Sequence, residues 1–254
     1  NGEIVAFNDD TREDNYGHGT HVAGIIAGIG AESADEYSGS AKGVSLLSMQ
    51  VLDGDGNGSM SDVMAALDWL LQYGQYFNIR VVNLSLGKGI SESNTTDPLV
   101  AAVEALWDQG VVVVVAAGNL GSAGPMTVKS PGNSRKAITV GSLTDTGTGD
   151  YSDDYVSSFS SRGPTLADHV LKPDLVAPGN RLIAAIPNGS KLLMELPERV
   201  KSCQGVSGCT AEYLELSGTS MAAPMVAAAA ALMLEKDPTL NPATVKARLM
   251  RSAR

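Results

Sequence analysis

The stretch VVVVVAAGNLG, residues 111–121, says more about the fold than any other part of the sequence. Five successive valines without polar alternation are typical of a strand that is buried on both faces, as in a parallel sheet covered by helices. Other short apolar or β-branched runs occur at residues 45–52, 79–86 and 136–143. We therefore expect four buried strands in one sheet.

Helical patterns lie between these strands. Residues 62–73 form one helix, which Ser61 can cap, and a second helix begins at Pro98 after the cap Asp97 and ends at Gly110. An alternation of strand and helix implies right-handed crossovers and parallel strands. The sequence thus predicts an α/β fold of three layers, with a mostly parallel central sheet and helices on both faces.

The composition limits the size and the partners of the molecule. The chain has 254 residues, of which 43% are hydrophobic, so we expect a single domain over residues 1–254. A net charge of −10 argues against nucleic acid or an anionic membrane as a partner. The longest apolar run, residues 225–234, is far shorter than the roughly 20 residues of a membrane span and predicts a buried helix instead.

A serine stands at the start of an apolar segment in ELSGTSMAAPMVAAAAALML, residues 215–234. Pro224 fits the first turn of a helix better than its interior, which predicts that Ser220 lies at a helix N-terminus. Free N–H groups and the helix dipole stabilise negative charge there, and the apolar run would hold the helix in the core. Ser220 is therefore a candidate nucleophile, although a serine at this place can also serve only as an N-cap.

Candidates for a general base are few, because the chain has three histidines. In YGHGTHVAG, residues 16–24, His18 follows a glycine turn at the expected start of a helix. His21 lies one turn further and is interpreted as a structural helix histidine, and His169 lies in a polar loop. A third candidate for the site is Asn119, which follows the valine strand and whose amide can donate a hydrogen bond to an oxyanion.

Several motifs together resemble the subtilisin-like serine proteases, the subtilase family, from about residue 15 to residue 241. These motifs are HGTHVAG, NLSLG, AAGN, SSFSSRGP, KPDLVAPG and LSGTSMAAP, in the order that the family has. The resemblance implies a subtilisin-like fold and a serine endopeptidase that acts on polypeptides through an acyl-enzyme. It implies that His18 is the base, Ser220 the nucleophile, and Asn119 with the Ser220 N–H the oxyanion hole.

The resemblance also implies a substrate groove. The family binds its substrate as an added strand between two segments, which correspond here to Gly56-Asn57-Gly58 and Ser85-Leu86-Gly87. The second segment would form one wall of the S1 pocket, and Ala117 with Gly118 the opposite wall. Lys129 lies in the segment that closes the pocket floor in relatives. An outward lysine favours large apolar side chains there, and an inward one favours acidic side chains; we expect the outward orientation.

The sequence departs from the family in one respect. The triad of the family begins with an aspartate in an Asp-Ser/Thr-Gly motif before the histidine, and these residues contain no such motif before His18. We therefore expect a domain that is truncated at its N-terminus and, after VKARLMRSAR, at its C-terminus as well. Its own N-terminal segment or a propeptide is then an expected partner, and Asp14 or Asp174 could replace the missing acid.

Two other classes of serine hydrolase do not fit the sequence. An α/β-hydrolase is excluded because its histidine follows the nucleophile, whereas all three histidines here precede Ser220. A chymotrypsin-like fold is all-β and does not match the alternation of strand and helix. The remaining alternative is a catalytically impaired subtilase or pseudoprotease that binds peptides or serves as a scaffold.

Three smaller features of the sequence concern metal binding, cofactors and the two cysteines. DGDGNGSMSDVM, residues 53–64, imitates half of an EF-hand loop but is interpreted as a turn, so no metal site is assigned. The resemblance implies no catalytic cofactor and allows structural calcium with no ligands that can be named. Residues 187–212 are an expected insertion, which contains Cys203 and Cys209. This pair forms either a disulfide, which would suit a secreted or extracytoplasmic protein, or two free thiols.

Overall fold

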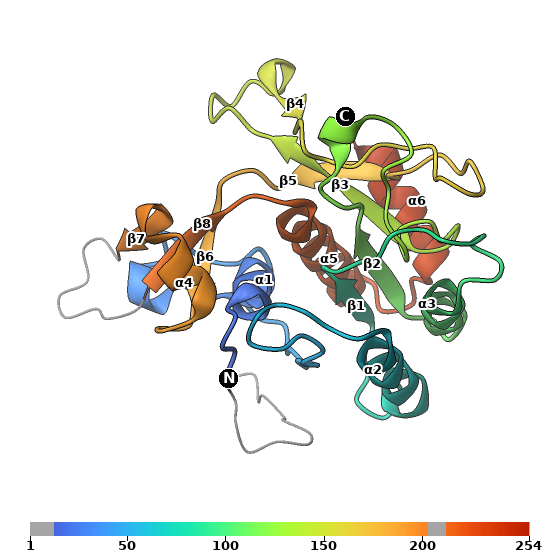
Figure 1. The fold of residues 1–254 in the computed structure, drawn as a ribbon. Helices are drawn as coiled ribbons and strands as arrows, with labels where there is room; N and C mark the ends of the chain where they lie inside the picture. Colours follow the sequence, from blue (N-terminus) through green and yellow to red (C-terminus); the bar gives the residue numbers. More distant parts are fainter. Residues whose placement is uncertain (1–12, 203–211, 254) are drawn as a thin grey trace. The chain divides into compact units, whose positions relative to one another are not determined.

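The computed structural model describes residues 13–202 and 212–253. By its internal contacts the chain divides into two compact units, Asn1–Ala66 with Arg181–Leu216, and Leu67–Asn180 with Ser217–Arg254. Helix α2 (Met60–Tyr73) carries the chain from the first unit into the second (Figure 1). The single domain expected from the sequence, with its truncated ends, stays a prediction.

The second unit is built on a sheet whose central strands are parallel. Strands β1 (Val81–Leu84), β2 (Val112–Ala116), β3 (Ile138–Thr144) and β5 (Leu175–Pro178) pair in parallel, and β4 (Tyr155–Val156) adds an antiparallel pair to β3. The register sets Val81 beside Val112 and Val114 beside Ile138. Every residue of β2 is buried, as the run of valines predicts for a strand covered on both faces.

Three helices pack on this sheet. Helix α5 (Thr219–Lys236) contacts β1, β2, β3 and β5, whereas α3 (Pro98–Asp108) and α6 (Pro242–Ser252) contact β2. The cap of α3 is Asp97, whose carboxylate accepts a hydrogen bond from the Leu99 N–H, as expected from the Asp-Pro pair. Short 3₁₀ turns occur at Gly121–Ala123 and Tyr151–Asp153. An α/β fold with a mostly parallel sheet and packed helices is thereby confirmed.

The first unit is smaller and contains an antiparallel sheet. Strands β6 (Leu182–Ile186) and β7 (Val200–Ser202) flank β8 (Glu212–Leu216), and α1 (His18–Ala27) packs on β6. Gly24 lets α1 approach β6 closely, because a Cβ there would lie only 3.2 Å from the Ala184 Cβ. The unit also holds α4 (Lys191–Glu195) and 3₁₀ turns at Ala31–Ser33 and Pro197–Arg199.

Two local expectations were wrong. Residues 45–52 form no strand, because they pair with no other strand among residues 13–202 and 212–253, and apolar composition alone does not make a ladder. Helix α2 begins two residues earlier than expected, so its cap is Ser59 and not Ser61. The Ser59 hydroxyl accepts a hydrogen bond from the Asp62 N–H at 3.1 Å and donates one to its carboxylate at 2.7 Å.

The expected insertion at 187–212 belongs to the first unit. Its described part consists of α4, the Pro197–Arg199 turn and β7, whereas Cys203 and Cys209 lie outside the described residues. In the part of the chain that is described, no helix has the length and hydropathy of a membrane span.

Candidate active site

Ser220 lies at the N-terminus of α5, where the sequence predicted it. It is the second residue of the helix, after Thr219, and is half-buried. The helix behind it buries Met221, Ala222, Ala223, Val226, Ala227, Ala228 and Ala230. This packing fixes the backbone of Ser220, while the free N–H groups of the first turn face a potential anion.

The proline that predicted this position has a different place in the helix. Pro224 lies inside α5, in its second turn, and therefore cannot donate an N–H to the carbonyl of Ser220 four residues earlier. That carbonyl instead accepts a hydrogen bond from the Ser85 hydroxyl at 2.8 Å. The Ser220 hydroxyl in turn donates to the Ser85 carbonyl at 3.3 Å. Ser85 thus holds both the backbone and the side chain of the candidate nucleophile.

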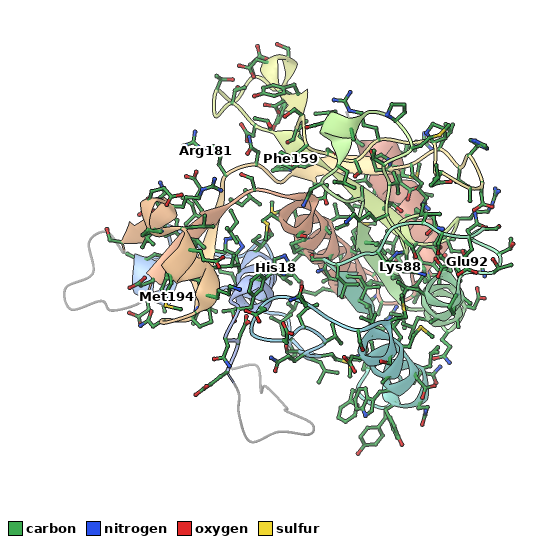
Figure 2. All side chains as sticks on the ribbon, in the orientation of Figure 1. His18, Lys88, Glu92, Phe159, Arg181 and Met194 are labelled. Carbon is green, nitrogen blue, oxygen red and sulfur yellow. The ribbon has the colours of Figure 1, made fainter. Side chains whose placement is uncertain are left out.

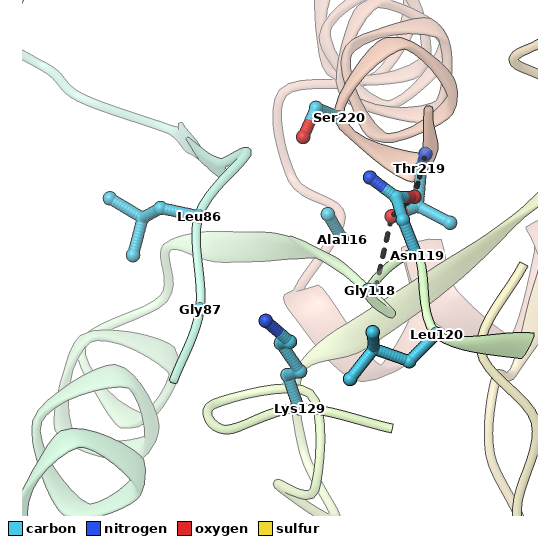
Figure 3. Close-up of a pocket in the computed structure, with 9 residues that line it drawn as sticks. All are labelled: Leu86, Gly87, Ala116, Gly118, Asn119, Leu120, Lys129, Thr219 and Ser220. Atoms are coloured by element: carbon cyan, nitrogen blue, oxygen red, sulfur yellow. Dashed lines mark hydrogen bonds between the residues drawn. The ribbon is translucent and has the colours of Figure 1, made fainter. Parts of the chain in front are cut away.

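Asn119 is oriented by Thr219, the buried residue before the nucleophile. Its Oδ1 atom accepts hydrogen bonds from the Thr219 N–H at 2.9 Å and from the Thr219 hydroxyl at 3.0 Å. Because a backbone N–H can only donate, the atom that faces it must be the amide oxygen, and the Nδ2 group is left as a donor. Figure 3 shows this nitrogen on the side of Asn119 that faces Ser220.

A pocket of about 180 Å³ opens beside Ser220 within the second unit (Figure 3). Its lining comes from the loop after β1, the end of β2 with the loop that follows, the segment around residue 129 and the start of α5. The residues that line it are Leu86, Gly87, Ala116, Gly118, Asn119, Leu120, Lys129, Thr219 and Ser220. The pocket therefore adjoins both the candidate nucleophile and the candidate oxyanion donor.

The wall that was assigned to Ala117 and Gly118 is made by Ala116 and Gly118. Side chains alternate in direction along an extended segment, so Ala116 faces the pocket and the fully buried Ala117 does not. The carbonyl of Ala117 instead helps to hold the segment around Lys129, because it accepts a hydrogen bond from the Lys129 N–H at 2.9 Å. Lys129 itself lines the pocket.

His18 is the first residue of α1 in the first unit and is half-buried (Figure 2). It follows Gly17, whose φ of 98° is the left-handed conformation that the glycine turn suggested. Burial lowers the pKa of its imidazole below the usual value, and the nearby charge of Asp14 opposes this shift. The shift favours the neutral imidazole, which is the form that a general base requires.

The two carboxylates that could replace a missing acid, Asp14 and Asp174, both have other hydrogen-bond partners. Asp14 accepts hydrogen bonds from the Gly17 N–H at 2.7 Å, and from the N–H and hydroxyl of Thr20 at 2.8 Å each. It thereby caps the start of α1. Asp174, in the second unit, pairs with Lys172 at 2.6 Å and Lys246 at 3.1 Å. Both carboxylates have structural roles.

The other two histidines take the places expected of them. His21 is fully buried, and its Nε2 atom lies 2.8 Å from the Leu214 carbonyl of β8. It is only half satisfied, because its Nδ1 atom has no hydrogen-bond partner among the described residues. His169 is exposed in its loop.

The glycines at residues 56 and 58 are required by packing within the first unit. A Cβ on Gly56 would collide with the Tyr16 ring, and one on Gly58 with the Val51 carbonyl. Close packing within the first unit thus requires both glycines, whether or not a peptide lies along this edge. The preceding residues form a turn, in which the Asp53 carboxylate accepts hydrogen bonds from the N–H groups of Asp55 and Asn57. No cluster of three or more metal-binding side chains occurs among the residues described here.

The sequence analysis missed Thr219 and the second role of Ser85. Thr219 is fully buried, and its hydroxyl also accepts a hydrogen bond from the Gly118 N–H at 3.0 Å. A hydroxyl residue directly before a candidate nucleophile is a weak signal that could have pointed to it. The contact between Ser85 and Ser220 joins residues 135 positions apart and has no signature in the sequence.

Comparison with known proteins places the sequence in a family. The sequence profile of the Subtilase family matches residues 3–254. The chain is 40% identical to serine protease AprX of Bacillus subtilis (strain 168), with 96% of this chain and 55% of that protein covered. It is 38% identical to an extracellular serine proteinase of Thermus sp. (strain Rt41A), with 94% and 46% covered. The chain thus spans about half the length of these two relatives.

A solved structure shows the same similarity in three dimensions. A cold-adapted subtilisin-like serine proteinase superposes with a TM-score of 0.66 at 32% identity, over 94% of this chain and 69% of that one. With a family profile that matches almost the whole sequence and this structural agreement, the chain belongs to the subtilase family of serine proteases.

Proposed function

We propose that this chain is a serine endopeptidase in which Ser220 is the nucleophile, His18 the general base, and Asn119 with the Ser220 N–H the oxyanion donors. The observation that carries the proposal is the orientation of Asn119. Its amide oxygen is held by Thr219, so the Nδ2 donor is fixed beside the N-terminus of α5 before any substrate binds. Donors that are oriented in advance need no reorganisation as charge develops.

The reaction then follows from these groups. The imidazole of His18 takes the proton of the Ser220 hydroxyl as its oxygen bonds to the substrate carbonyl carbon. The resulting oxyanion accepts hydrogen bonds from Asn119 Nδ2 and the Ser220 N–H. When the intermediate collapses, His18 gives its proton to the leaving amine and an acyl-enzyme remains. Water, deprotonated by the same imidazole, releases the acid and restores Ser220.

Substrate would lie between the segments 56–58 and 85–87, with one side chain in the pocket beside Ser220. The lining of that pocket by Leu86 and Gly87 supports the second segment. We further propose that the protein works outside the cytoplasm, as the name of the Thermus relative says of that protein. Fractionation of the source cells, with detection of the chain, tests this location.

A second candidate is a peptide-binding subtilase with impaired catalysis. It is favoured by one observation: among the residues described, no carboxylate is hydrogen-bonded to His18, and Asp14 and Asp174 are engaged elsewhere. Without an acid on the imidazole, turnover is slow. In subtilisin, a member of this family, loss of the acid alone lowers kcat by about 3 × 10⁴.

Labelling with a serine-directed phosphonate separates the two candidates. An activated serine is phosphonylated at Ser220, and mass spectrometry locates the adduct. We expect labelling of the protein and none of Ser220→Ala, with His18→Ala strongly slowed. Absence of any adduct, while peptides still bind, would favour the peptide-binding alternative.

A further inference from the structure

We propose that Lys129 makes the pocket beside Ser220 selective for an acidic side chain, glutamate or aspartate, on the residue whose carbonyl is attacked. This inference rests on the proposed peptidase function and specifies its substrate. The sequence favoured an outward lysine and a preference for large apolar residues. The path of the side chain reverses that expectation.

Two glycines give the stem of Lys129 its path. A Cβ on Gly118 would lie 3.0 Å from the Lys129 Cγ, and one on Gly87 would lie 3.2 Å from its Cβ. The stem therefore runs between the two walls of the pocket, in space that any other residue at 87 or 118 would fill. Gly118 has a φ of 106°, which other residues rarely adopt. The backbone conformation therefore favours glycine at this position, and glycine leaves room for the lysine stem. Figure 3 shows the side chain rising from the floor, with its amine end directed into the space between the walls.

The ammonium group has no partner of its own in the part of the chain that is described. A nearby cation, Lys88, lies 3.4 Å from the fully buried carboxylate of Asp97. Asp97 also accepts hydrogen bonds from the Leu99 N–H at 3.0 Å and from the Ser130 hydroxyl at 2.7 Å. This carboxylate is thus occupied by other groups. No carboxylate or other acceptor is bonded to the Lys129 ammonium group among residues 13–202 and 212–253, so its charge is available to a ligand.

The other residues that line the pocket leave the Lys129 charge as the feature that determines which substrate side chain is preferred. Among the described residues, no acidic side chain lines the pocket, and Leu86, Ala116 and Leu120 supply apolar surface. An apolar substrate side chain would displace water from the ammonium group without replacing its hydrogen bonds, which costs free energy. A carboxylate would replace those hydrogen bonds with a charge-assisted one.

The net charge of the chain opposes the binding of acidic peptides. At −10 it repels acidic peptides at long range. Salt screens exposed charges beyond roughly 8 Å at physiological ionic strength, whereas a direct contact in a pocket is screened much less. We therefore expect the selectivity to appear in the bound state and to persist at moderate salt.

A substrate series that varies only the pocket residue tests this proposal. The whole protein is assayed with peptides that carry Glu, Asp, Gln, Leu, Phe or Lys at that position. We expect kcat/KM for Glu to exceed that for Gln on the order of tenfold. Lys129→Met should abolish this ratio and favour Leu, and Lys129→Glu should favour Lys. The matched control Lys136→Met removes a lysine that pairs with Asp108 on the surface of the same unit, and should leave the ratio unchanged.

A binding measurement keeps the proposal testable if the protein does not turn over. In Ser220→Ala, product peptides that end in Glu or in Gln at the pocket position are titrated, and their Kd values are compared. Tighter binding of the Glu peptide that disappears with Lys129→Met supports the pocket assignment even where catalysis fails. Equal binding of both peptides, or a Glu/Gln ratio that Lys129→Met leaves intact, overturns it.

Discussion

Thr219 is the residue on which the orientation of Asn119, the proposed oxyanion donor, depends. It contacts Asn119 through two hydrogen bonds and Gly118 through a third, and it is fully buried. A position next to the nucleophile thereby sets the direction of an amide a hundred residues earlier in the chain. The sequence suggested Asn119 as a donor but carried no clear sign of Thr219, the residue that orients its amide.

Substitutions at Asn119 and Thr219 should distinguish the loss of the proposed oxyanion donor, the Asn119 amide, from the loss of the hydroxyl that orients it. In subtilisin, removing the corresponding kind of donor lowers kcat by about 10² to 10³. We expect Asn119→Ala to act similarly here with little change in KM. Thr219→Val keeps the backbone N–H bond and loses the hydroxyl bonds, so its loss of kcat should be smaller. Steady-state kinetics with one peptide substrate checks both changes.

Two outcomes would contradict this assignment. An unchanged kcat for Asn119→Ala would remove the amide from the mechanism. A larger loss for Thr219→Val than for Asn119→Ala would mean that Thr219 acts by some route other than the amide.

At the scale of elements, α5 combines a proline in its second turn with Ser220, the proposed nucleophile, in its first. Pro224 costs the helix one hydrogen bond, and the carbonyl that loses it is that of Ser220. The Ser85 hydroxyl supplies the missing donor from the loop after β1. The proline therefore opens a place at which a second element can hold the nucleophile.

A double-mutant cycle tests this coupling. Ser85→Ala leaves the Ser220 carbonyl without its donor, and we expect kcat to fall by about 10-fold to 100-fold through misplacement of the hydroxyl. In a Pro224→Ala background the helix supplies its own N–H to that carbonyl. Ser85→Ala should then cost much less, so the two substitutions are non-additive. Additive effects on kcat would show that the two residues act independently.

The elements themselves were predictable where their cause is local. The valine run gave β2, the Asp-Pro pair gave the start of α3, and the glycine turn gave the start of α1. Residues 45–52 have the composition of a strand but no partner in the described sheet, and pairing cannot be read from one segment. The inward path of Lys129 depends on gaps at two distant glycines, which is likewise information that only the folded chain contains.

At the scale of the whole molecule, a buried histidine links acid stability to the folding of the first unit. His21 joins α1 to β8 through its Nε2 atom, which must carry the proton because the Leu214 carbonyl can only accept. Its Nδ1 atom is therefore unprotonated and has no partner among the described residues. A second proton would create a charge in the buried core, and desolvation disfavours that charge more than the backbone of Leu214 and Leu182 stabilises it. Burial accordingly lowers the pKa of His21 to about 4.

The pH dependence of stability follows from the difference in the pKa of His21 between the folded and the unfolded chain. An unfolded His21 titrates near pH 6.5, so between pH 6.5 and 4 the unfolded chain binds a proton that the folded chain does not. The free energy of unfolding should therefore fall as the pH is lowered through this window, by about 3 kcal/mol from this residue, and the contribution should level off below pH 4. Urea unfolding at several pH values, followed by a probe in the first unit, measures the slope of the free energy of unfolding against pH.

The control is His21→Gln, whose side chain can still donate to the Leu214 carbonyl but does not titrate. This variant should be less stable at pH 7 and lose most of that slope. A slope that His21→Gln leaves unchanged would assign the acid sensitivity to other groups.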